Sequence, residues 1–221
     1  MKILAIEFSS EKRSVAIVEK LSGEQSQLRG SALEKGGRSA HAFALIEQVL
    51  QQAQMEREEI DCIAVGLGPG SYTGIRATIA LAQGWLLARE IKLVGISSVE
   101  CLAAQAFING NRGRASFIVD AQRNEFYLAA YEMNESGFSE IETLRLATFS
   151  EVEKQITEKQ IVFGPGATRV FPEARDLYPH AATLGQLACE KADFFSGEKL
   201  EPIYLREVSF VKAPPPRVIA D

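Results

Sequence analysis

Two glycine turns are the places in this sequence where residue types and spacing first suggest chemistry. Gly68-Pro69-Gly70 ends an apolar run and is followed by the hydroxyl groups of residues 71–73, and Gly164-Pro165-Gly166 ends a second apolar run. Glycine lets a backbone approach a phosphate closely, and the free N–H groups at the start of a helix attract anions. Neither turn is followed by the lysine of a P-loop, so the sequence excludes that kind of phosphate site.

The sequence signals for a catalytic nucleophile and for a metal site are weaker. Ser71 follows a glycine turn, but the G-x-S-x-G spacing of a nucleophile elbow is absent, and we interpret Ser71 or Thr73 as a helix cap. His41 and His180 are the only histidines, and the three or four convergent ligands of a zinc or iron site cannot be assembled around them. The sequence therefore predicts neither a catalytic residue nor a metal ligand.

The elements that position these turns follow a recognisable order. Strands at 2–6, 14–18 and 25–33 are joined by short links, so we expect them to be antiparallel neighbours. Apolar spacing and caps predict the elements that follow, which are a helix over 39–54 capped by Ser39, a strand over 62–67, an almost wholly apolar helix over 73–90, a strand over 91–96, and a helix from the capping box at 97–100 to about 108.

This order is that of the ribonuclease H-like fold, which is also half of an actin-like or hexokinase-like ATPase. We therefore expect an α/β protein with two related subdomains, each built from a mixed sheet and flanking helices. A polar linker at 109–114 separates the predicted N-terminal subdomain, 1–108, from a smaller one, 114–211. The tail 212–221 contains three consecutive prolines and is expected to be disordered.

The second subdomain begins again with strands. Its predicted elements are strands over 116–121, 125–131, 141–147 and 161–163, a short helix capped by Ser150, a helix over 183–194, and a late strand over 202–206. Each half has a hairpin start and an apolar strand that ends in Gly-Pro-Gly, which hints at a duplicated fold.

ATPases of this fold grip phosphates with two hairpins and use an aspartate to hold a water of the metal. In the first hairpin Glu7 stands where aspartate is wanted, and the second, which contains Asp120, lacks glycine as the first does. Only the turn with Gly164 and Gly166 resembles the third, nucleoside-side turn. A degenerate or absent nucleotide site is expected, with these four residues as its weak candidates.

The charge, the cysteines and the apolar segments limit the kinds of protein that this sequence can encode. The 221 residues carry 24 Lys and Arg against 29 Asp and Glu, and the net charge of −5 argues against nucleic-acid binding by the overall field. The three isolated cysteines lie in apolar settings, which predicts buried free thiols in a reducing cytosol. We see no signal peptide, and the apolar helix with Arg76 inside it is a poor membrane span, so a cytoplasmic protein is expected.

Several blocks of the sequence resemble the bacterial TsaB family. The blocks, in chain order over residues 1–206, are MKILAIEFSS, SVAIV, RSAHAFALIEQVL, VGLGPGSYTGIRATIALAQGWLLA, VDAQRNEFYLAAY and PIYLR. The motif GPGSYTGIR is the most specific of them. The sequence departs from the usual pattern at Glu7, where Asp is typical, and after His41, where Ser-Glu is common. These departures weaken a nucleotide role and leave a scaffold role untouched.

The resemblance implies a non-catalytic subunit that helps to form threonylcarbamoyladenosine in tRNAs reading codons that begin with A. The implied partners are a TsaD-like catalytic subunit and a TsaE-like ATPase, with tRNA bound only by the complex and ATP or ADP possible at one of its interfaces. TsaD-like chains carry an HxxxH pair whose positions fall at Ser98 and Leu102 here, and neither side chain holds a hard transition metal.

The helices 39–54 and 73–90 are expected to form the partner surface. Ala80, Gly84 and Ala88 follow i, i+4, i+8 spacing, which lets another helix approach closely, and a four-helix contact with the partner is expected. The expected interface residues are His41, Phe43, Leu45, Arg76, Ala77, Ala80, Leu81, Gly84, Trp85 and Ala88.

Three alternatives stay open at this point. Ala80 and Gly84 could instead fit beneath the second subdomain. The chain could act alone as a small-molecule kinase or ATPase, with Glu7 and Asp120 binding Mg-ATP. It could also be a homodimer with its own binding role, and we expect the chain to dimerise when alone because an exposed apolar stripe can pair with itself.

Overall fold

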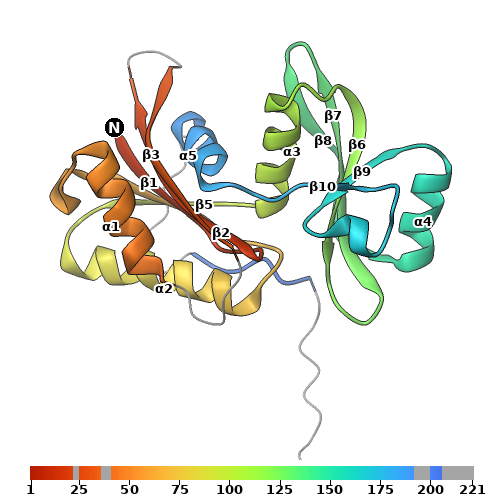
Figure 1. Ribbon diagram of the computed structural model, residues 1–221, viewed down its shortest axis with the longest axis horizontal. Helices are drawn as coiled ribbons and strands as arrows, with labels where there is room; N and C mark the ends of the chain where they lie inside the picture. The colour runs from red at the N-terminus through yellow and green to blue at the C-terminus, as the bar shows by residue number, and fades with distance from the viewer. Residues whose placement is uncertain (22–24, 36–40, 192–199, 206–221) are drawn as a thin grey trace, which may run out of the picture.

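The computed structural model describes residues 1–21, 25–35, 41–191 and 200–205, which form two five-stranded mixed sheets with helices around them (Figure 1). The strand orders are β3-β2-β1-β4-β5 and β10-β9-β6-β7-β8. Each sheet is an antiparallel meander of three strands whose first strand, β1 or β6, pairs in parallel with the next strand of the chain, β4 or β9, and that strand pairs in parallel with β5 or β10. The predicted α/β fold with two related subdomains is confirmed, and the repeated strand order is its clearest sign.

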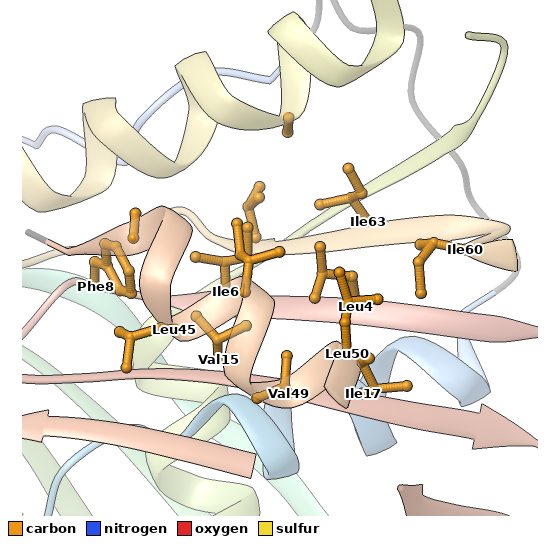
Figure 2. Packing of buried hydrophobic residues seen from close by; sticks show 14 of the residues in the cluster. Leu4, Ile6, Phe8, Val15, Ile17, Leu45, Val49, Leu50, Ile60 and Ile63 are labelled. Atoms are coloured by element: carbon orange, nitrogen blue, oxygen red, sulfur yellow. The ribbon is translucent and has the colours of Figure 1, made fainter. Parts of the chain in front are cut away.

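The first sheet supplies the larger core. Its strands are β1 (Lys2–Glu7), β2 (Lys12–Lys20), β3 (Ser26–Lys35), β4 (Cys62–Gly66) and β5 (Lys92–Ile96). The helices around it are α1 (Ala42–Ala53), α2 (Tyr72–Ala88), α3 (Ser98–Ile108) and α5 (Ala181–Glu190). The side chains of Leu4, Ile6 and Ile17 pack beneath α1 and α2 (Figure 2), whereas Ile3 and Ala5 point to the opposite face, toward α3 and α5. Helices on both faces explain why β1, β4 and the middle of β2 are buried apolar runs, whereas the edge strand β3 is largely polar.

The second sheet shares α3 with the first. Its elements are β6 (Gly113–Asp120), β7 (Glu125–Asn134), β8 (Gly137–Thr148), α4 (Phe149–Thr157), β9 (Ile161–Gly164) and β10 (Arg175–Asp176). Two 3₁₀ turns complete the list, η1 (Arg57–Glu59) in the first subdomain and η2 (Ala167–Arg169) in the second. Leu102 and Ala106 of α3 join the core beside Phe117, while Cys101 of the same helix joins the core of the first sheet.

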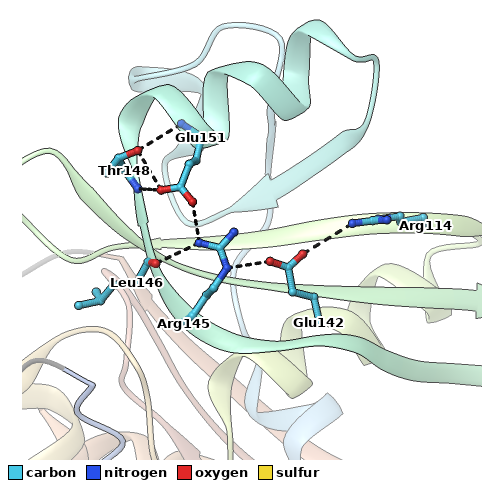
Figure 3. Close-up of polar contacts among 6 residues, drawn as sticks. All are labelled: Arg114, Glu142, Arg145, Leu146, Thr148 and Glu151. Atoms are coloured by element: carbon cyan, nitrogen blue, oxygen red, sulfur yellow. Dashed lines mark hydrogen bonds and ion pairs between the residues drawn. The ribbon is translucent and has the colours of Figure 1, made fainter.

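Three helix starts differ from the predicted ones by more than one residue, and one of them is that of α5, which begins at Ala181 instead of residue 183. Helix α4 is capped by Thr148 instead of Ser150: Thr148 Oγ1 accepts a hydrogen bond from Glu151 N, and the Glu151 carboxylate accepts one from Thr148 N at 2.7 Å. Arg145 then joins Glu151 to Glu142 and ties the helix to β8 (Figure 3). Helix α1 begins after His41, and the predicted cap Ser39 lies outside the described residues.

The C-terminal part also differs from the prediction. Helix α5 covers 181–190 and packs on β1 and β2, so the range 114–211 expected for the second subdomain includes a helix that belongs spatially to the first sheet. The late strand expected at 202–206 is wrong for the described residues 202–205, where Ile203 N only donates one hydrogen bond to Leu67 O, at 2.9 Å. The predicted disordered tail, 212–221, lies outside the described residues.

Candidate functional site

The first glycine turn packs against another part of the same chain, the turn between β1 and β2. Ser71 caps α2, accepting a hydrogen bond from Gly74 N at 3.3 Å, and its own N–H donates to Ser9 O at 2.7 Å. A Cβ at Gly70 would lie 2.1 Å from Ser9 O, and one at Gly74 would lie 2.0 Å from Phe8 O. These glycines are therefore required by the close approach of the β1–β2 turn to the start of α2, and the cap interpretation of Ser71 is confirmed.

Glu7 is completely buried at the end of β1. Its Oε1 accepts a hydrogen bond from Ser9 N at 2.7 Å, and its Oε2 accepts one from Ser98 Oγ at 2.9 Å. A Cβ at Gly66 would overlap the carboxyl group, so β4 needs glycine at this position. Burial raises the pKa of the Glu7 carboxyl above its ordinary value, and the hydrogen bonds from Ser9 and Ser98 oppose that shift only in part.

A nucleotide with its metal would be expected near the end of β1 in an actin-like ATPase, and the residues here do not fit one. Both oxygens of Glu7 are engaged within the protein, and none of its surface is exposed. The two positions that correspond to the HxxxH pair are also inaccessible to a metal. Ser98 is hydrogen-bonded to Glu7, and Leu102 is fully buried in the core. Within the described ranges, no three His, Cys, Asp or Glu side chains are grouped to hold a metal ion.

The other candidates for nucleotide binding have local structural roles. Asp120 is exposed at the end of β6, and its Oδ1 accepts a hydrogen bond from Gln122 N at 2.7 Å. Gly164 ends the neighbouring parallel strand β9, where a Cβ would lie 2.2 Å from Ile118 O. Gly166 has a positive φ of 64°, which favours glycine in the turn before η2. The structure places Asp120 and Gly164 at one sheet edge and leaves Glu7 buried in the other sheet.

Helices α1 and α2 leave an apolar groove between them on the outside of the first sheet. The groove has a volume of about 580 Å³ and is lined by Phe43, Ile46, Arg57, Glu58, Ala80, Leu81, Gly84, Trp85, Ala88 and Arg89. Phe43 of the groove is 66% exposed, and Leu87 of α2, which is not one of the lining residues, is 91% exposed. Isolated exposed apolar residues are ordinary, whereas a contiguous apolar groove indicates a binding surface.

The groove brings together six of the ten expected interface residues: Phe43, Ala80, Leu81, Gly84, Trp85 and Ala88. Leu45 is wrong as an interface residue because its side chain is 7% exposed and packs in the core. Ala77 is half-buried on α2. His41 is exposed at the start of α1, where its Nδ1 lies 2.8 Å from Glu34 Oε1.

Arg76 is held by the C-terminal segment. Its guanidinium lies over the ring of Tyr72, 4.2 Å from the centroid, and its Nε donates to Tyr204 Oη at 3.4 Å. The two tyrosine rings stack with their centroids 5.6 Å apart. This cluster fixes residues 200–205 beside the first turns of α2.

Gly84 does not lie beneath the second subdomain. A Cβ built on Gly84 has no atom of the described residues within 4 Å, and Gly84 and Ala80 are both exposed. The alternative in which these small residues fit under the second subdomain is therefore wrong, and the space above them is open.

The sequence reasoning missed one part of the groove and one exposed residue of α2. Arg57 and Glu58 come from η1, in a stretch for which no element was predicted, and Arg89 Nη1 joins them by donating to Arg57 O at 3.3 Å. Leu87, which is 91% exposed but does not line the groove, was not among the expected interface residues. A leucine between the small residues Gly84 and Ala88 is the signal that could have found it.

Comparisons with known proteins agree with this structure. The family model "TsaD: tRNA N6-adenosine threonylcarbamoyltransferase" matches residues 38–204. The chain is 27% identical to the tRNA threonylcarbamoyladenosine biosynthesis protein TsaB of Escherichia coli, over 97% of this chain and 99% of that protein. The TsaB protein of Haemophilus influenzae is 26% identical, over 97% of this chain and 98% of its own length.

A solved structure supports the fold. YeaZ from Pseudomonas aeruginosa superposes with a TM-score of 0.73, covering 92% of this chain and 99% of that one at 23% identity. No helix in the described part of the chain is long and apolar enough to cross a membrane. From the span of the family model and the full-length similarity to several TsaB proteins, we conclude that the chain belongs to the TsaD family and, within it, to the TsaB proteins.

Proposed function

We propose that this chain is a non-catalytic subunit that pairs with a TsaD-like catalytic subunit in the formation of threonylcarbamoyladenosine in tRNA. The names of the TsaB relatives support the pathway. The observation that carries the pairing is the open apolar groove between α1 and α2. It presents small residues on α2 next to Phe43 and Trp85, which is the combination that a helix of another subunit can pack against closely.

The environment of Glu7 supports a non-catalytic role for the chain. A nucleotide-dependent enzyme of this fold needs an acidic group that faces the metal and its water, and Glu7 faces Ser9 and Ser98 inside the protein. We infer that the chemistry belongs to the partner and that this chain contributes surface and shape. The rival activity, a small-molecule kinase or ATPase acting alone, has no such open acidic group at the end of β1.

The remaining partners follow from the same proposal. A TsaE-like ATPase joins the pair, tRNA binds only to the complex, and any ATP or ADP lies at an interface of the complex. The assembly works in the cytoplasm. The same groove lets two copies of the chain associate when the catalytic subunit is absent, so the homodimer and the heterodimer compete for one surface.

Reconstitution with omission tests the proposal. The chain is mixed with TsaD-like and TsaE-like partners, unmodified tRNA, ATP and threonylcarbamoyl-adenylate, and the modified nucleoside is quantified by mass spectrometry after digestion of the tRNA. Modification is expected only when the chain is present. Equal modification without the chain contradicts the proposed role.

A second measurement separates the rival activity. Isothermal titration of Mg-ATP into the isolated chain is expected to give no binding heat, because the Glu7 carboxyl is enclosed. Saturable heat that disappears in a Glu7→Gln variant would instead support the chain acting alone. Titrating the TsaD-like partner into the same preparation provides the positive control for a correctly folded sample.

A further inference from the structure

An ion pair joins the two subdomains at their junction. Arg169 Nη2 donates to Glu11 Oε1 at 2.5 Å, and Arg169 Nη1 donates to Glu11 Oε2 at 3.2 Å. Tyr178 Oη donates to the same Oε1 at 3.0 Å. A guanidinium that grips both oxygens of a carboxylate fixes orientation as well as distance, which a single ionic contact does not.

Both ends of this contact are anchored in their own subdomains. On the first side, Glu11 lies in the β1–β2 turn, where Ser9 O accepts the hydrogen bond from Ser71 N at the start of α2. On the second side, η2 is held in place because Thr168 N and Oγ1 both donate to Asp176 Oδ1, at 3.0 and 2.9 Å. The ion pair therefore connects two turns that are each held in place by hydrogen bonds.

The arrangement of the two subdomains indicates what the Glu11–Arg169 ion pair can do. Helix α3 contributes Cys101 to the core of the first sheet and Leu102 to that of the second. The chain passes between the sheets after α3 and again through residues 177–180, seen as the light-blue segment that leads to α5 (Figure 1). Two bodies that share one helix can still turn about it, and Glu11 and Arg169 both lie off that helix.

We propose that Glu11, Arg169 and Tyr178 form an interdomain latch that fixes the angle between the two sheets. Lys12 supports it, because its Nζ lies 3.8 Å from the centroid of the Tyr178 ring. The latch also sets the position of the second subdomain relative to α2, because the turn that carries Glu11 accepts a hydrogen bond from Ser71, the N-cap residue of that helix. With side chains 44% and 66% exposed, Glu11 and Arg169 are accessible to salt, and high ionic strength loosens the latch.

Distance measurements on charge-reversal variants of the full chain test the latch. Spin labels are attached through Gln51→Cys on α1 and Glu153→Cys on α4, both exposed positions, while the three native cysteines are buried. Labelled chain is diluted into an excess of unlabelled chain, so that only distances within one molecule contribute. Double electron–electron resonance then reports the separation of the subdomains.

Glu11→Arg and Arg169→Glu each place like charges together, and we expect each to give longer and broader distance distributions. The double swap Glu11→Arg/Arg169→Glu restores attraction and is expected to return the wild-type distribution. Arg114→Glu is the matched control, because Arg114 pairs with Glu142 within the second sheet, and no change is expected.

The outcomes decide the proposal. Single variants that keep the wild-type distribution, or a double swap that fails to restore it, overturn the latch. If a single variant does not fold, the wild-type chain measured in low salt and in about 1 M salt gives the same decision, because a 3 Å screening length weakens this exposed pair. Broadening in high salt supports the latch, and an unchanged distribution overturns it.

Discussion

Ser98 donates a hydrogen bond from Oγ to Glu7 Oε2 at 2.9 Å and accepts one from Gly68 N at 3.2 Å. Through this pair, the end of β1, the turn after β4 and the start of α3 are tied together at one buried point. Ser9 N completes the arrangement by donating to the other oxygen of Glu7. The position where related folds direct an acidic group to a ligand is here a structural connection within the protein.

The buried carboxyl predicts a graded effect of substitution at Glu7. Glu7→Ala removes the acceptor from Ser9 N–H and Ser98 O–H and leaves a cavity, so we expect the free energy of unfolding to fall by about 2–4 kcal/mol. Glu7→Gln keeps the shape and one acceptor oxygen, and a loss of no more than about 1 kcal/mol is expected. Urea unfolding measures both. A glutamine variant as damaged as the alanine variant would show that the charged carboxylate is needed.

The same residue predicts how stability depends on pH. Burial raises the pKa of folded Glu7 above the ordinary 4.5, so the folded chain holds this proton more tightly than the unfolded chain does. Its contribution is complete below the unfolded pKa and declines as pH rises from about 4.5 through the folded pKa.

Comparison of wild type with Glu7→Gln isolates this contribution, because exposed carboxyls such as Glu11 and Asp176, whose pKa is lowered by Arg169 and Thr168 respectively, act in the opposite direction in both proteins. The free energy of unfolding of wild type minus that of the variant should decrease as pH rises above 4.5. A difference that increases with pH would contradict a raised pKa at Glu7.

Much of the fold could be predicted because its signals are local. The period of apolar residues located α1, and the Gly-Pro-Gly turns marked the ends of β4 and β9. The caps were less certain, since Ser150 and Thr148 offer the same hydroxyl and only the reach of Glu151 back to Thr148 N decides between them. The place of α5 depends on contacts between residues far apart in the chain, which no local pattern contains.

The candidate site could be predicted in part for the same reason. Ala80, Gly84 and Ala88 share a helix face by spacing alone, and three of the other expected residues, Phe43, Leu81 and Trp85, line the same groove. Leu45 went wrong as an interface residue because it has the same apolar spacing as Ile46 and Val49, and the stripe with that spacing packs against the sheet. The environment of Glu7 was hidden, because Ser98 is 91 residues away in sequence.

The cap of α2 offers a test of local stability. Ser71→Ala removes the side-chain acceptor of Gly74 N, and we expect the free energy of unfolding to fall by about 1 kcal/mol. Thr73→Ala alters a neighbouring exposed hydroxyl and is expected to change it by less than about 0.5 kcal/mol. Equal losses in the two variants, measured by urea unfolding, would contradict Ser71 as the cap.

The cysteines predict slow thiol chemistry in the folded chain. Burial raises the pKa of Cys62 to about 12 and also raises that of Cys101 and Cys189. Because the thiolate is the reactive form, none of the three should react with Ellman's reagent within minutes at pH 8, whereas all three should react in denaturant. Rapid release of one equivalent by the native protein would show that a thiol is accessible.

The groove makes the sharpest prediction about assembly. Gly84→Trp places a large side chain into the open space above α2, where no described atom lies within 4 Å of the new Cβ. We therefore expect a folded protein with nearly unchanged thermal stability and a loss of affinity for the TsaD-like partner of at least about tenfold, or 1.4 kcal/mol. Thermal unfolding measures the stability, and titration calorimetry with size-exclusion chromatography measures the association. Ser150→Trp, on the exposed start of α4, adds the same bulk to the other subdomain and should leave affinity unchanged. Wild-type affinity in Gly84→Trp would place the partner elsewhere, because a helix packed over Ala80 and Ala88 has no room for tryptophan between them.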